Sequence, residues 1–68
     1  MLPDAVLGEL ALLATHLTGL VRACVDSASL AAFLHEEEAR YLAQLPAGSH
    51  DELRAAFAAM YARLPAPG

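Results

Sequence analysis

Residues 6–24 read VLGELALLATHLTGLVRAC, and their apolar side chains recur at alternating spacings of four and three residues. That spacing places them in one line along a single helix face. The line, called here the first seam, consists of Val6, Leu10, Leu13, Leu17, Leu20 and Cys24. Leu7 and Leu12 flank the first seam on its two sides and widen the apolar arc, so that this helix can face two neighbours at once.

Two shorter apolar stripes follow along the chain. One consists of Leu30, Leu34, Tyr41 and Leu45, and the other of Leu53, Phe57, Met60 and Leu64. Sixteen Ala and thirteen Leu among 68 residues are a helix-forming composition, and no alternating strand pattern competes with it. The sequence therefore predicts an all-α chain of three helices in a single domain.

Two breaks separate the predicted helices. Pro46-Ala47-Gly48-Ser49 ends one helix and begins the next, with Ser49 and Glu52 in the spacing of a capping box. The earlier break, Asp26-Ser27-Ala28-Ser29, rests only on short polar residues that favour caps, so one continuous helix is the alternative there. With Pro3-Asp4 as the opening, we predict helices over residues 4–25, 28–45 and 50–64. They would form a helical hairpin followed by a shorter third helix.

The apolar surface of three such helices predicts self-association. A chain of this length buries only about 60% of its unfolded surface, so a lone protomer is expected to leave part of its seams uncovered. We expect a homodimer or higher homo-oligomer that completes a helical bundle. Its interface would contain Val6, Leu10, Leu13, Leu17 and Leu20, with Tyr41, Met60 and Tyr61 as contacts to a partner protein, because aromatic and Met side chains are enriched at interfaces. Leu17→Asp is expected to give a monomer or an unfolded chain.

Charge and composition exclude several classes of function. The net charge is −4 and the four arginines are spread along the chain, which argues against nucleic-acid binding. The most apolar window, residues 10–21, is shorter than the roughly 20 residues of a transmembrane helix. The first helix also lacks the Lys/Arg-rich polar face of a membrane-surface helix, and no basic N-terminal region suggests a secretory signal. We expect a cytoplasmic protein that binds neither nucleic acid nor membrane.

The sequence offers no catalytic motif and no cofactor-binding motif. It has no Gly-rich phosphate loop, no nucleophile elbow and no Cys-x-x-Cys pair, so we expect neither an enzyme nor a bound cofactor. The single cysteine, Cys24, lies on the first seam and is expected to be a small buried hydrophobic residue. Glu36 is expected to pair with Arg40 one helical turn away.

A metal-binding bundle is the alternative function. If the first two helices form an antiparallel hairpin that turns at Asp26-Ser27, His16 lies opposite Glu37 and close in height to His35 and Glu38. His35-x-x-Glu38 reverses the Glu-x-x-His order of di-metal bundles. The same cluster could instead form a pH-responsive interface, or its histidines could simply be exposed.

The leading hypothesis is a small helical protein–protein interaction module. It would act as an adaptor, chaperone-like or regulatory protein through an apolar helix face, as a homodimer that binds another protein. No stretch of the sequence resembles a known family closely enough to name one.

Overall fold

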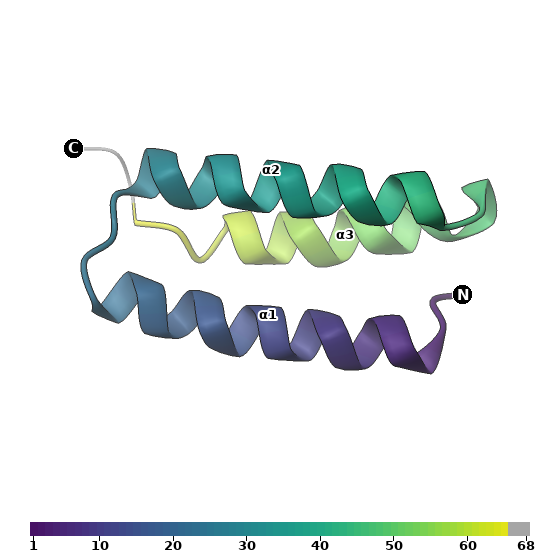
Figure 1. Ribbon diagram of the computed structural model, residues 1–68, viewed down its shortest axis with the longest axis horizontal. Helices are drawn as coiled ribbons and strands as arrows, with labels where there is room; N and C mark the ends of the chain where they lie inside the picture. The colour runs from purple at the N-terminus through teal and green to yellow at the C-terminus, as the bar shows by residue number, and fades with distance from the viewer. Residues whose placement is uncertain (66–68) are drawn as a thin grey trace.

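The computed structural model describes residues 1–65 and contains three α-helices (Figure 1). They are α1 (Asp4–Arg22), α2 (Ser27–Gln44) and α3 (His50–Tyr61), with a 3₁₀ helix, η1 (Ala47–Ser49), before α3. Each helix runs antiparallel to the one before it, in a bundle of 36 × 18 × 16 Å. No strand occurs among the described residues, so the all-α prediction is confirmed.

The break between α1 and α2 is real, and α1 ends three residues before the predicted residue 25. Cys24 has a left-handed backbone with φ of 61°. Its N–H donates to the Val21 carbonyl (3.1 Å) and the Val25 N–H donates to the Leu20 carbonyl (3.2 Å), which is the Schellman pattern of a helix C-terminus. Because the helix unwinds at this point, the Cys24 side chain is exposed, and the prediction that it is buried on the first seam is wrong.

The N-terminus of α2 is capped by the short polar residues that predicted it. The Asp26 carboxylate accepts hydrogen bonds from the Ser29 N–H (3.1 Å) and hydroxyl (3.4 Å). At the other end, Leu45 is already extended, with ψ of 148°, because the residue before a proline is pushed out of the helical region. The helix therefore lies within one residue of the predicted 28–45 at each end.

The capping box predicted at the start of α3 does not form. Ser49 has helical backbone angles because it is the last residue of η1, whereas a capping serine needs an extended backbone. Its hydroxyl donates instead to the Met1 carbonyl (3.1 Å). Glu52 accepts the Leu2 N–H (3.2 Å) and pairs with the N-terminal ammonium (3.1 Å). These contacts hold the first two residues against α3, which ends at Tyr61, three residues before the predicted residue 64.

Nine apolar side chains from all three helices and the N-terminal segment meet in one core. These are Leu2, Leu10, Leu17, Leu30, Leu34, Tyr41, Leu53, Phe57 and Met60. The α2 and α3 helices form the closest pair, and α1 packs against α3 at a greater separation (Figure 1). A single chain therefore covers most of the surface that the sequence assigned to a second copy.

Candidate functional site

The side of α1 that points away from the core is the candidate functional site. We call it the outer face of α1; its residues are Ala5, Leu7, Gly8, Ala11, Leu12, Thr15, Thr18 and Gly19, all exposed. Only Leu10 and Leu17 of the nineteen residues in this helix are buried. Leu12 is 73% exposed and Leu7 47%, and the other residues of this face are Ala, Gly and Thr.

The polar groups of the outer face are turned toward their own helix. The Thr15 hydroxyl donates to the Ala11 carbonyl and the Thr18 hydroxyl donates to the Ala14 carbonyl, each at 3.1 Å. Such bonds within the helix satisfy the hydroxyl protons and leave methyl groups on the surface. By length and composition alone, α1 is apolar enough to cross a membrane.

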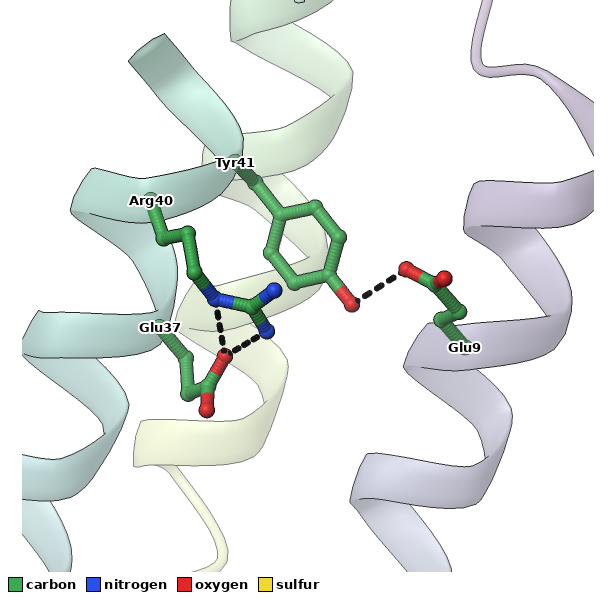
Figure 2. Close-up of polar contacts among 4 residues, drawn as sticks. All are labelled: Glu9, Glu37, Arg40 and Tyr41. Atoms are coloured by element: carbon green, nitrogen blue, oxygen red, sulfur yellow. Dashed lines mark hydrogen bonds and ion pairs between the residues drawn. The ribbon is translucent and has the colours of Figure 1, made fainter. Parts of the chain in front are cut away.

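A hydrogen bond at one edge of the outer face joins α1 to α2. The Tyr41 hydroxyl donates to the Glu9 carboxylate at 2.8 Å, and the tyrosine points from α2 toward α1 (Figure 2). Burial of the ring, followed by the bond to Glu9, raises the pKa of the Tyr41 phenol above its usual value. Glu9 is the only charged residue of α1 between its first and last residues, and this bond occupies it.

Arg40 packs over the same tyrosine. Its guanidinium carbon lies 5.0 Å from the centre of the Tyr41 ring, in the range of a cation–π contact. The guanidinium also donates to the Glu37 carboxylate, through Nε at 3.1 Å and through a second nitrogen. We predicted that Arg40 pairs with Glu36, which is the residue before Glu37, and that prediction is wrong. The hydrogen bond to Glu37 raises the pKa of Arg40.

A second tyrosine–carboxylate contact joins α2 to α3. The Tyr61 hydroxyl donates to Glu38 at 3.5 Å, and the His35 ring lies 5.0 Å from the Tyr61 ring. Burial, followed by the charge of Glu38, raises the pKa of the Tyr61 phenol. Glu38 is half-buried with this hydroxyl as its partner.

The residues of the predicted metal site do not converge. The His16 ring lies 6.5 Å from the Phe33 ring rather than opposite Glu37, so α2 is displaced along α1 by about one helical turn from the predicted register. His35 faces Tyr61 of α3 instead. No group of three or more His, Cys, Asp or Glu within residues 1–65 could hold a metal ion. The geometry therefore does not support the metal-binding alternative.

Most of the predicted interface residues serve the core of their own chain. Leu10, Leu17, Tyr41 and Met60 are buried there. Val6, Leu13, Leu20 and Tyr61 are half-buried against the same core. The large apolar side chains that α1 leaves exposed are Leu7 and Leu12, which the spacing analysis treated only as flanks of the first seam.

No protein family, curated protein or solved structure matches this chain.

Proposed function

We propose that the protein is a small helical protein–protein interaction module, an adaptor, chaperone-like or regulatory protein, that acts through the outer face of α1 as a homodimer. The observation that carries the proposal is the exposure of Leu12 and Leu7 on a helix face beside Glu9, whose carboxylate is already hydrogen-bonded to Tyr41. Exposed apolar faces of this kind mark interaction sites. The role needs no catalytic group and no cofactor.

Small residues make the outer face suited to another helix. Gly8, Ala11 and Gly19 carry little or no side chain, and a Cβ built on either glycine would meet no atom within 4 Å. A helix laid along these positions can approach the α1 backbone closely. Leu7 and Leu12 stand on the two sides of this strip and would pack against the flanks of the incoming helix.

The size of the surface favours weak, reversible association. The chain exposes 4404 Å², while a compact monomer of 7.1 kDa exposes roughly 4,100 Å², so the lone protomer is already well packed. Fully burying one Leu contributes about 1.5–3 kcal/mol, and the large apolar side chains on the outer face of α1 are Leu12 and the exposed half of Leu7. We therefore expect dissociation constants on the order of 100 μM, in the range of transient complexes.

Sedimentation equilibrium over a wide concentration range tests the proposal. The wild-type chain should shift from monomer to dimer between about 10 μM and 1 mM, as the expected constant requires. Leu12→Glu should weaken this association at least about tenfold, because it places two charges in the interface. Ala58→Glu is the matched control, since Ala58 is exposed on α3 and lies one turn after Arg54.

Three results would contradict the proposal. A wild-type chain that stays monomeric to about 1 mM would remove the homodimer. Equal weakening by Leu12→Glu and Ala58→Glu would show that α1 is not the contact. Binding to neutral lipid vesicles that Leu12→Glu abolishes would identify a bilayer as the surface that covers the outer face.

Leu17→Asp cannot distinguish a dimer contact from loss of folding, because Leu17 is fully buried and its replacement would unfold the chain.

A further inference from the structure

A pocket of about 280 Å³ opens at the end of the bundle where α1 terminates and the chain leaves α3. It is lined by Leu17, Thr18, Val21, Arg22 and Arg63. Its lining is mostly apolar, and its volume is close to the roughly 300 Å³ at which small-ligand pockets begin. Apolar walls with two guanidinium groups suit a ligand with one apolar part and one anionic part.

The two arginines are the notable feature of this pocket. The chain has four arginines in all. Arg40 is bound to Glu37, while Arg22 and Arg63 line one pocket, and neither lies within 4.0 Å of a carboxylate in the part of the chain that the structure describes. Two like charges beside one pocket repel each other. An anion bound between them adds two attractions, which offset that repulsion. Planar guanidinium groups bind carboxylates and phosphates through two parallel hydrogen bonds.

Stabilisation of the helix ends does not by itself explain why both arginines line this pocket. Cations at helix C-termini stabilise the helix dipole, and Arg22 is in the last turn of α1. However, the backbone already satisfies the carbonyls at this end. The Leu20 and Val21 carbonyls accept the Val25 and Cys24 N–H groups, and the Met60 carbonyl accepts the Arg63 N–H. The guanidinium groups are therefore not needed as hydrogen-bond partners of the helix ends.

We propose that this pocket binds a small amphipathic anion. Arg22 and Arg63 would hold a carboxylate or phosphate head, and a short alkyl or aryl group would lie on Val21 and Thr18, above the buried Leu17. The binding is non-covalent and requires no change in the bundle. The pocket shares Thr18 with the outer face of α1, but the proposal rests on Arg22 and Arg63, whereas the proposed dimer rests on Leu7 and Leu12 toward the other end of α1.

Nuclear magnetic resonance titration of the full chain tests this site directly. The probes are octanoate and octyl phosphate, with octanol as the uncharged control. We expect saturable shifts of the Val21 and Thr18 methyl groups and the two guanidinium groups, with a dissociation constant on the order of 1 mM. Octanol should give no saturable shift. The tighter of the two anions identifies the preferred head group.

Matched variants separate the site from general charge effects. Arg22→Gln and Arg63→Gln should each weaken binding about fivefold or more, and added salt should weaken it further. Arg54→Gln removes the same charge from an exposed position on α3 outside the pocket and should leave binding unchanged. Circular dichroism melts of all three variants confirm that each chain is folded.

Three outcomes would overturn the proposal. They are the lack of saturable binding up to about 10 mM ligand, ten times the expected constant, octanol binding as tightly as octanoate, and equal weakening by Arg54→Gln. None of these bears on the sedimentation result, so the failure of one proposal leaves the other intact.

Discussion

Cys24→Gly is expected to stabilise the protein, and the structure gives the size of the effect. Cys24 occupies the left-handed position of the Schellman motif that ends α1, where glycine is the usual residue. A residue with a Cβ pays roughly 1–2 kcal/mol to adopt this conformation, and glycine does not. Glycine also gains freedom in the unfolded chain, which removes about 0.5–1 kcal/mol of that benefit. The net gain is about 0.5–1 kcal/mol.

Nothing else at this position offsets the gain. The thiol is exposed and approaches the Arg22 carbonyl at 3.9 Å. Sulfur is a weak donor, so this contact contributes little. The backbone hydrogen bonds from Cys24 and Val25 to α1 do not depend on the side chain and remain in the variant.

Thermal unfolding by circular dichroism measures the effect, in a reducing buffer that keeps the exposed thiol of the wild type from forming intermolecular disulfides. For a domain of this length, 1 kcal/mol shifts the Tm by about 4–8 °C, so Cys24→Gly should raise it by about 2–8 °C. Cys24→Ala is the control, because it removes the thiol but keeps the Cβ, and it should not gain stability. If the glycine variant melts no higher than the alanine variant, the account of strain at Cys24 is wrong.

Four further changes test the fold. Gly19→Ala should raise the free energy of unfolding by about 1 kcal/mol, as urea denaturation will measure, because alanine favours a helix more than glycine does and the added methyl group has room. Tyr41→Phe should lower the same free energy by about 1 kcal/mol through loss of the bond to Glu9. The raised pKa values of Tyr41 and Tyr61 mean that folding favours the neutral phenols. Their contribution to stability is complete below the unfolded tyrosine pKa of about 10 and is lost as pH rises through the folded values, which ultraviolet titration of tyrosinate alongside circular dichroism will follow. Leu17→Asp should unfold the chain at 25 °C, as far-ultraviolet circular dichroism will show, because it buries a charge without a partner.

The helical core was predictable because it depends on periodicity. Leu53, Phe57 and Met60 on α3 repeat at the helical spacing, and all three are buried. Periodicity states which face of a helix is apolar, and the fold respects it. It does not state what covers that face. Leu10 and Leu17 were assigned to an interface between chains, and they are buried within one chain.

The helix ends were less predictable because contacts distant in sequence decide them. Ser49 and Glu52 fit a capping box locally, but the first two residues of the chain bind both side chains, at sequence separations that no local pattern reveals. Leu2 becomes part of the core through the same contacts, although it lies outside every seam. At Cys24 the local signal pointed the wrong way, since glycine, the usual residue at such a position, does not occur there.

The register between α1 and α2 could not be predicted from the sequence. An antiparallel hairpin fixes which helix ends meet, but the way in which side chains interdigitate decides which residue of α1 lies opposite which residue of α2. The Tyr41–Glu9 bond and the His16–Phe33 contact both correspond to a shift of about one turn from the predicted pairing. That shift is enough to separate His16 from Glu37 and to remove the predicted polar cluster.

The outer face of α1 is the part of this helix that another surface can cover while the bundle stays folded. If α1 left the bundle to cross a bilayer, Glu9 would lose Tyr41 and enter the hydrocarbon, at a cost of about 2.5–3.5 kcal/mol near the centre. Core side chains of α2 and α3 that share one cluster with Leu10 and Leu17 would become exposed to water, at a cost on the order of several kcal/mol. Contact through Leu7 and Leu12 requires neither change. The proposed contact at Leu12 therefore leaves the bundle folded, and for this reason Leu12→Glu is the variant that tests the proposed function.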